Sequence, residues 1–319
     1  MSGNDRWTMR VYRGVPDGTD RPLALTIGNF DGLHRGHQAM LGRLVEAARS
    51  LGLESAVMTF EPHPREFFSP EDAPARLTTL REKLEGFRTA HVDRAYVCRF
   101  DRRFAALEPE AFVRELIGAR LSTRWLLVGD DFRFGARRGG DYDLLSSHAD
   151  SLGFHLHAMP SIMVRGERVS STMVRGALAA GDLALARDCL GHPYTIAGRV
   201  MHGNKLGRTI GFPTANVALR RARAALQGIF AVQLGGIAPH PLPGVASLGT
   251  RPTVTRNGMP TLEVHLFDFD ADIYGKHVTV HFLHKLRNEE RYPDLASLTR
   301  QIGIDADNAR RFFAEMSDD

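Results

Sequence analysis

The sequence predicts two domains of different class: an α/β domain built on a parallel sheet, followed by a small antiparallel β-barrel with C-terminal helices. Two observations carry this prediction. From about residue 23 to residue 180, strand-like apolar runs alternate with helical patterns, which favours parallel strands joined by crossover helices. After residue 190, short apolar runs follow one another closely between Gly and Pro residues, which is typical of a small barrel. A chain of 319 residues is long enough for both domains.

In the first half, apolar runs are expected to form strands, and the stretches between them are expected to form helices. The expected strands are Leu23–Ile27, Ser55–Phe60, Arg94–Cys98, Trp125–Val128 and His155–Met159. The expected helices include Gln38–Ser50, Leu80–Ala90 and Pro109–Leu116. In the first of these helices, apolar residues from Met40 to Ala48 recur at helical spacing. Parallel sheets bind ligands at the carboxyl ends of their strands, and the loop Gly28–His37 lies at such an end.

The second half is expected to consist of strands until its last segment. These strands are Tyr194–Met201, Ile229–Leu234, Val245–Leu248, Leu262–Phe267 and Val278–Leu283. A helical tail follows, with Asp294 as the expected N-cap before Leu295, Leu298 and Ile302. Gly191-His-Pro193 indicates a linker boundary. We therefore predict a first domain over residues 1–185, a linker over 186–193 and a second domain over 194–319.

Composition and charge favour a soluble cytoplasmic protein that handles small anions. Hydrophobic residues make up 43% of the chain and charged residues 24%, which are ordinary globular values. The net charge of +4 is too evenly spread to argue for DNA or RNA binding. Cys98 and Cys189 stand far apart, which indicates neither a zinc site nor a disulfide framework. No signal peptide or membrane span is visible, and the oligomeric state stays open.

The segment Gly28-Asn-Phe-Asp-Gly-Leu-His-Arg-Gly-His37 is the strongest functional motif in the first half. Its glycines allow a sharp turn between an expected strand and an expected helix. The N–H groups and the dipole at the start of a helix form a natural anion site. His34 and His37 stand three residues apart at this entrance, on nearly one face of the helix. The motif therefore predicts phosphate chemistry on a nucleotide.

Three further segments lie at expected strand ends of the same sheet. Thr59-Phe-Glu-Pro-His-Pro64 supplies stiff apolar walls, and Val128-Gly-Asp-Asp-Phe-Arg-Phe-Gly135 combines carboxylates with aromatic rings. Ser170-Ser-Thr-Met-Val-Arg175 opens a helix with hydroxyl groups and an arginine, which suits a second phosphate clamp. Each segment alone is more often a turn or a helix cap. Their common location at one end of the sheet favours a shared site.

In this order, the four segments resemble the FAD synthetase module of bacterial bifunctional riboflavin kinase/FAD synthetases, which belong to the HxGH nucleotidyltransferases with a Rossmann-like fold. The resemblance implies that His34 and His37 stabilise the ATP phosphates while the phosphate of FMN attacks the α-phosphorus and pyrophosphate leaves. Further ATP-binding residues implied by it are Gly28, Phe30, Asp31, Gly32, Ser171, Thr172 and Arg175. Residues implied to lie near the flavin or adenine are Pro62, Pro64, Phe68, Asp131 and Phe132.

A second dense motif runs from Gly198 to Asn216. It contains Gly198-x-x-x-x-Gly203, but Asn204 follows where a P-loop requires Lys, which excludes a Walker site. Signatures of protein kinases are absent as well. The Gly-rich stretch, with Lys205 and Arg208, is typical either of a flap around phosphates or of a flexible hairpin. Thr214 and Asn216 carry oxygen atoms suited to Mg²⁺.

The run Leu262–Asp270 alternates as a strand does, which puts Glu263 and His265 on one face. A carboxylate on a rigid strand is a reasonable general base for an alcohol, although most strand glutamates are simply exposed.

The segments Gly207–Asn216, Gly244–Thr253, Leu262–Gly275 and Phe282–Arg287 resemble the riboflavin kinase module of the same bifunctional family. The resemblance implies that Thr214 and Asn216 bind Mg²⁺ and the ATP phosphates, and that Glu263 takes the proton from the ribityl 5′-hydroxyl. The residues of the flap that it assigns to ATP are Gly203, Lys205, Gly207 and Arg208. Arg287 is implied to border the flavin.

The resemblance extends over nearly the whole chain and predicts a cytoplasmic enzyme that converts riboflavin to FMN and then FMN to FAD. Its small-molecule substrates are riboflavin, FMN and ATP, its cofactor is Mg²⁺, and neither a nucleic acid nor a membrane is expected as a partner. Three alternatives stay open: only one module is active, the chain is a flavin-binding regulator without turnover, or the first domain modifies another small phosphate. His34, His37 and Glu263 have no obvious use in a passive binder, which disfavours the regulator.

Overall fold

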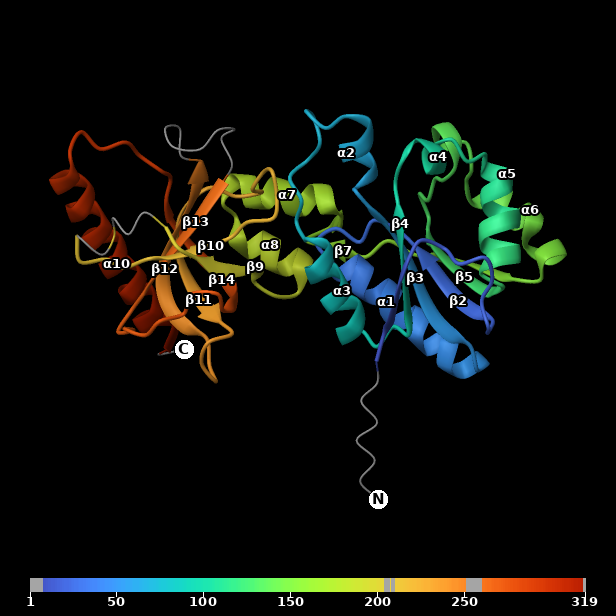
Figure 1. Cartoon of the computed structure of the whole chain (residues 1–319), viewed down its shortest axis with the longest axis horizontal. Helices are drawn as coiled ribbons and strands as arrows, with labels where there is room; N and C mark the ends of the chain where they lie inside the picture. The colour runs from blue at the N-terminus through green and yellow to red at the C-terminus, as the bar shows by residue number, and fades with distance from the viewer. Residues whose placement is uncertain (1–7, 204–206, 208–209, 251–259, 318–319) are drawn as a thin grey trace, which may run out of the picture. The chain divides into compact units, whose positions relative to one another are not determined.

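The computed structural model describes residues 8–203, 207, 210–250 and 260–317 (Figure 1). Its internal contacts divide the chain into two compact units. The first unit, here called the α/β unit, consists of Met1–Pro74 and Leu80–Val169. The second, here called the barrel unit, consists of Ala75–Thr79 and Ser170–Asp319. Each unit is described by itself.

The α/β unit is built on a six-stranded sheet in the order β1-β4-β3-β2-β5-β6, and every neighbouring pair is parallel. The strands are β1 (Arg10–Arg13), β2 (Leu23–Ile27), β3 (Glu54–Glu61), β4 (Arg94–Arg99), β5 (Thr123–Gly129) and β6 (His155–Met159). All five predicted strands and their parallel arrangement are confirmed. The edge strand β1 was missed because it is short and its residues are mostly exposed.

The strand order reverses between β2 and β5, which lie side by side in the sheet. A crevice opens at such a point, outside the carboxyl ends of the two strands. The loops that follow β2 and β5 are Gly28–His34 and the stretch after Gly129. Two of the predicted functional segments therefore flank the place where a sheet of this topology binds its ligand.

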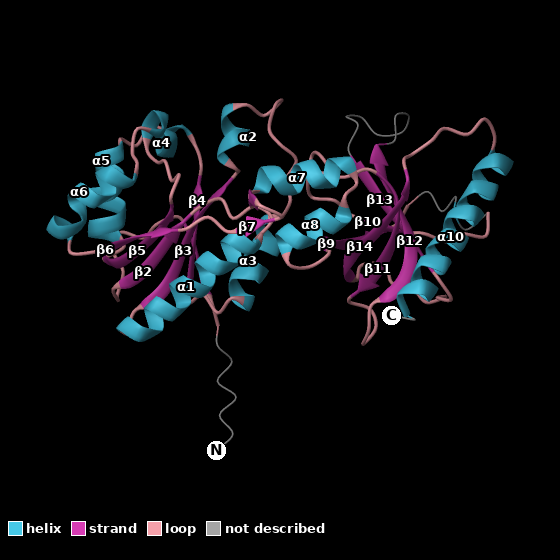
Figure 2. Ribbon diagram, turned by 180° about the vertical axis from the view of Figure 1, so that it is seen from behind, coloured by secondary structure: helices cyan, strands magenta, loops and turns pink. Residues whose placement is uncertain are grey.

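Helices cover both faces of the sheet, which Figures 1 and 2 show from opposite sides. One face packs against α1 (Arg35–Leu51) and α3 (Leu80–Thr89) through side chains such as Leu44 and Phe87. The other packs against η1 (Phe112–Arg120) and α6 (Tyr142–Leu152). Short elements complete the unit: α2 (Pro64–Phe68), α4 (Arg102–Ala105), α5 (Pro109–Ala111), η2 (Ala136–Arg138), β7 (Met163–Val164) and β8 (Glu167–Arg168). The predicted helix at 109–116 is present as α5 and η1, of which η1 is π-helical.

The barrel unit contains a closed six-stranded barrel in the order β10-β13-β12-β11-β14-β9, with antiparallel neighbours throughout. Its strands are β9 (Tyr194–Met201), β10 (Ala215–Val217), β11 (Gly228–Gly235), β12 (Leu242–Thr250), β13 (Pro260–Leu266) and β14 (His277–Arg287). The five predicted strands are confirmed. The sequence analysis missed β10, which is only three residues long. Strand β13 alternates buried and half-buried residues, as the sequence indicated for Leu262–Asp270.

Helices flank the barrel in sequence: α7 (Ser171–Ala180) and α8 (Leu183–Leu190) precede it, and α10 (Leu295–Ser317) follows it. Asp294 accepts the backbone N–H of Ser297 at 2.7 Å, which confirms it as the N-cap of α10. Among the described residues, this one long helix stands in place of the predicted C-terminal helices. Its Ala306 and Ala309 pack against Ile229 and Val245 of the barrel.

Residues Ala75–Thr79, here called the 75–79 segment, belong to the barrel unit although they come from the first half of the chain. The guanidinium of Arg221 is buried and donates hydrogen bonds to the carbonyl groups of Arg76 and Leu77, at 3.3 and 3.1 Å. Arg175 donates to the carbonyl group of Ala75 at 2.7 Å. Residues 186–190 of the predicted linker form the end of α8, so the connection to β9 is three residues long.

Over the described ranges, no helix combines the length and the apolar character that crossing a membrane requires.

Candidate active sites

The loop between β2 and α1 makes a tight turn that ends at the two histidines. Phe30, Gly32 and Leu33 have positive φ values of 50°, 84° and 44°. Such angles are costly for residues with a side chain and persist only where the surrounding structure enforces them. Phe30 is fully buried, and its ring meets that of Phe87 edge-on at 5.2 Å. This buried ring anchors the loop, so that His34 becomes the N-cap of α1.

The imidazoles of His34 and His37 lie stacked, with ring centroids 3.7 Å apart and planes 18° from parallel. The backbone N–H of His37 donates to Nδ1 of His34 at 3.4 Å. Because Nδ1 accepts, the ring proton of neutral His34 sits on Nε2. A Cβ at Gly36 would lie 3.2 Å from the His34 ring. Glycine at position 36, directly before His37, therefore leaves room for the imidazole of His34.

His37 is held in its neutral form. Burial lowers the pKa of His37 well below its usual range, and the neighbouring His34 and Lys83 lower it further. Its Nδ1 is buried without a hydrogen-bond partner among the described residues. Lys83 on α3 is itself only 3% exposed, which is unusual for a lysine. The sequence analysis missed Lys83 because a lysine in an amphipathic helix normally faces solvent.

The loop after β3 presents aromatic surface at the same edge of the sheet. Pro64 begins the short helix α2, which His63 caps. Phe68 at the end of α2 is 65% exposed, and its ring lies 5.6 Å from that of Phe100. An exposed phenylalanine beside other rings is suited to a flat aromatic ligand. The predicted flavin-side residues Pro62, Pro64 and Phe68 therefore share one short stretch.

The loop after β5 is held by an arginine that the sequence analysis did not single out. Arg168 on β8 forms ion pairs with Asp130 at 3.0 Å and with Asp131 at 2.9 Å. Phe132, next in the chain, stacks on Phe134 with centroids 5.5 Å apart. Arg168 precedes Ser170 by only two residues, and this closeness to a predicted phosphate clamp was the signal that could have identified it. The predicted ligand-binding residues Asp131 and Phe132 are thus fixed beside a cation.

The predicted segment Ser170–Arg175 opens α7 in the barrel unit. Ser170 is the N-cap and accepts the backbone N–H of Met173 at 3.1 Å, so Ser171 and Thr172 occupy the first turn. Arg175 follows one turn later. That these residues bind the triphosphate together with the histidine pair stays a prediction.

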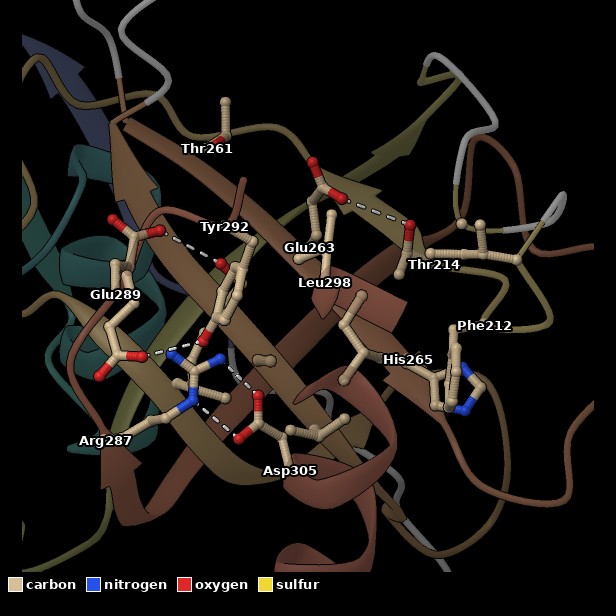
Figure 3. A pocket seen from close by; sticks show the side chains of 18 residues that line it. Phe212, Thr214, Thr261, Glu263, His265, Arg287, Glu289, Tyr292, Leu298 and Asp305 are labelled. Carbon is tan, nitrogen blue, oxygen red and sulfur yellow. Dashed lines mark hydrogen bonds and ion pairs between the residues drawn. The ribbon is translucent and has the colours of Figure 1, made fainter. Parts of the chain in front are cut away.

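The barrel site centres on Glu263 and Thr214 (Figure 3). The hydroxyl of Thr214 lies 3.5 Å from Oε2 of Glu263, and Asn216 is the register partner of Glu263 across β10 and β13. A Cβ at Gly203 would collide with the amide of Asn216, which explains the glycine there. The predicted metal-binding pair therefore lies with the predicted base. Lys205 and Arg208 lie outside the described residues.

Two cavities meet at Thr214. One, of about 280 Å³, combines apolar and aromatic side chains with polar and charged ones, namely Thr214, Glu263, His265, Arg287, Glu289, Glu290 and Asp305. The other, of about 250 Å³, is lined by Pro213, Thr214 and the stretch Phe269–Tyr274. Gly207 lines the larger one. A site with two adjoining cavities and a carboxylate in one of them, 3.5 Å from the residue that both share, can hold two molecules and transfer a group between them.

Arg287 lines the larger cavity and also joins α10 to β14. Its guanidinium forms two hydrogen bonds with Asp305, at 2.8 and 2.6 Å, and this pairing raises the pKa of Arg287. Asp305 is only 3% exposed. A direct contact of Arg287 with the flavin stays a prediction.

Tyr292 and Glu289 also line the larger cavity (Figure 3), and the sequence analysis named neither. Both follow β14 in a loop without periodicity, so no pattern marked them.

Comparisons with known proteins identify the family of both halves of the chain. The family model for FAD synthetase matches residues 17–173, and that for riboflavin kinase matches residues 190–313. The chain is 49% identical over 308 residues to the bifunctional riboflavin kinase/FMN adenylyltransferase of Escherichia coli strain K12, a match that covers 96% of this chain and 98% of the relative. It is 46% identical over 309 residues to the protein of the same name from Haemophilus influenzae, covering 96% and 99%.

Among solved structures, a crystal structure described as a macrolide-efflux protein from Streptococcus pneumoniae is similar over 95% of this chain and 98% of its own. The TM-score is 0.79 and the identity 29%. With two family models in succession and high identity along the full length of its relatives, the chain belongs to the bacterial bifunctional riboflavin kinase/FMN adenylyltransferase family.

Proposed function

We propose that the barrel phosphorylates riboflavin to FMN with ATP, and that the α/β domain transfers AMP from a second ATP to FMN, which yields FAD and pyrophosphate. Membership of the bifunctional family supports both activities. The observation that carries the proposal is that Thr214 lines both cavities while Glu263, 3.5 Å from its hydroxyl, lines the larger one. Phosphoryl transfer needs a donor and an acceptor side by side, with a base at the acceptor hydroxyl.

For the kinase step, we assign the larger cavity to riboflavin and the smaller one to ATP. The larger cavity has the aromatic and apolar lining that a flavin ring system requires. Glu263 takes the proton of the ribityl 5′-hydroxyl as that oxygen attacks the γ-phosphorus, and ADP leaves with the electron pair of the broken P–O bond. Gly203, Lys205 and Arg208 are assigned to the ATP phosphates. Gly207, which the resemblance also assigns to ATP, lines the larger cavity and is assigned to the boundary between the two molecules.

Mg²⁺ fits the oxygen donors gathered around Glu263. Thr214 supplies a hydroxyl and Asn216 an amide oxygen, and these are ligand types that Mg²⁺ accepts alongside water and phosphate. The two residues would hold the ion, which neutralises charge on the transferring phosphate. The use of ATP in both steps supports a cytoplasmic location.

For the adenylyl step, the attacking group is the FMN phosphate, which is already an anion and needs no base. His34 donates through Nε2–H to the phosphate oxygens on which charge develops, and His37 assists from the same face. Gly28, Phe30, Asp31 and Gly32 shape the turn around the ATP phosphates. Ser171, Thr172 and Arg175 are the proposed ligands of the triphosphate, and Pro62, Pro64, Phe68, Asp131 and Phe132 those of the ring systems.

The test is chromatography of riboflavin incubated with ATP, Mg²⁺ and the purified protein. FMN is expected first and FAD second. Riboflavin that stays unchanged would refute the kinase assignment, and FMN that accumulates without FAD would refute the adenylyltransferase assignment. A flavin-binding regulator would bind riboflavin, as measured by quenching of its fluorescence, without consuming ATP.

A further inference from the structure

We propose that His265 is a positioning residue of the kinase step, because it holds the segment Phe212–Thr214 in place as the wall between the two cavities. The inference rests on the proposed kinase function and adds a residue to it. Through this wall, His265 keeps the hydroxyl of Thr214 opposite the carboxylate of Glu263.

Two contacts of His265 involve this segment, and its ring also meets that of Phe267 edge-on, with centroids 6.0 Å apart. Its Nδ1 lies 2.9 Å from the carbonyl oxygen of Pro213. A carbonyl oxygen only accepts, so Nδ1 carries the ring proton and donates it. The ring also meets that of Phe212 edge-on, with centroids 5.3 Å apart and planes at 76°. The side chain of His265 therefore contacts two consecutive residues of the segment, Pro213 by a hydrogen bond and Phe212 by ring packing.

The hydrogen bond lies where the barrel ladder ends. The first register pair between β10 and β13 is Ala215 with Val264, so Pro213 lies beyond the paired stretch. Proline has no N–H and cannot extend the ladder as a donor. The side chain of His265 instead bonds the carbonyl oxygen of Pro213, beyond the paired stretch.

The segment Phe212–Thr214 lies between the two cavities, and its residues line one or both of them. Phe212 lines the larger cavity, Pro213 lines the smaller one, and Thr214 lines both. A shift of the segment would change both cavities at once and would move the hydroxyl of Thr214 from its place 3.5 Å from Glu263. The geometry at the reacting groups thus depends on a residue that does not itself react.

Figure 3 shows His265 on the same strand as Glu263, beside Phe212 and away from the carboxylate. The alternation of β13 puts both side chains on one face, two residues apart. With Nδ1–H committed to Pro213, the ring is fixed in orientation. This arrangement assigns proton removal to Glu263 and positioning to His265.

The test compares two variants that separate the hydrogen bond from the ring. His265→Asn keeps a donor near the position of Nδ1, and His265→Phe keeps a ring and loses the donor. We expect His265→Phe to lower kcat for riboflavin phosphorylation roughly tenfold to hundredfold, since small displacements of reacting groups have effects of this size. His265→Asn should stay within about threefold of the unaltered protein, and the dependence of kcat on pH should keep its shape in both.

FMN adenylylation, measured in the same preparations with FMN supplied, should be unchanged, and the thermal unfolding transition of each variant is the control for folding of the barrel. Equal kinase rates in all three proteins would overturn the positioning role. A His265→Asn protein as slow as His265→Phe, or a pH profile that loses one limb, would also overturn it, because the ring itself would then be needed. Absence of kinase activity in the unaltered protein would refute the proposed function, and the inference with it.

Discussion

The loop of the α/β unit and the strand of the barrel unit, each proposed to act in a transfer of phosphate groups, present opposite chemistry. The loop places two imidazoles at the end of a tight turn in which Phe30, Gly32 and Leu33 have positive φ values. The strand places a carboxylate, Glu263, on a regular ladder of a closed barrel. The proposed reactions account for this difference: the attacking FMN phosphate is an anion whose charge must be neutralised, whereas the attacking riboflavin hydroxyl must lose a proton.

The largest effect is expected from a variant that removes the proposed base of the kinase step. Glu263→Gln keeps the size of the side chain and loses the proton acceptor, so riboflavin phosphorylation should fall about 10²–10⁴-fold. FAD formation from supplied FMN should be unchanged. The exposed Glu315 on α10 offers a matched control, because Glu315→Gln should affect neither rate. Chromatography of both reactions measures all rates, and a loss of both activities in folded Glu263→Gln would contradict two independent sites.

The reciprocal change is His37→Ala. We expect FAD formation to fall about 10²–10³-fold, the usual effect of removing a preorganised donor, while riboflavin still yields FMN. His240→Ala, at an exposed position in the barrel unit, is the control and should leave FAD formation intact. An unchanged rate of FAD formation in His37→Ala would show that the imidazole takes no part in adenylyl transfer.

A third variant tests how closely the imidazole stack is packed. Gly36→Ala would put a methyl group 3.2 Å from the His34 ring, so the ring must shift and FAD formation should fall by about tenfold. Gly42→Ala lies on the same helix with nothing within 4 Å of the added carbon. It should keep full activity and raise the free energy of unfolding by about 0.5–1 kcal/mol. Equal activity of the two variants would mean that the stack tolerates displacement.

The smallest expected effect concerns the charge state of His37. Its pKa in the folded protein lies below the unfolded value near 6.5, because of burial first and of His34 and Lys83 next. The unfolded chain therefore binds more protons in the range between these two pKa values. Stability should fall as the pH drops below about 6.5 towards the folded pKa, and His37→Gln should remove this part of the loss.

NMR titration of the imidazoles measures the pKa directly. Lys83→Met removes a positive charge near His37 and should raise the pKa of His37 towards its ordinary value. Lys276→Met, at an exposed site in the barrel unit, should leave it unchanged. A His37 pKa that is the same in both variants would exclude an electrostatic effect of Lys83.

Most of the fold followed from periodicity, because buried strands such as Leu23–Ile27 are continuous apolar runs. Strands β1 and β10 were not predicted because they are short and their own composition does not mark them as strands. The glycine and histidine motif identified the first site because its spacing is local. Lys83 and Arg168 were missed because their role depends on contacts between distant segments, which no local pattern records.

The 75–79 segment has a consequence for how such a protein can be divided. A truncated gene that begins at Ser170 would encode Arg175 and Arg221 without the carbonyl groups of Ala75, Arg76 and Leu77 that accept their hydrogen bonds. Leaving a buried donor without its acceptor costs about 1–3 kcal/mol. A kinase half encoded from Ser170 onward should therefore be less stable than one that also carries these five residues, which are encoded nearly a hundred codons upstream.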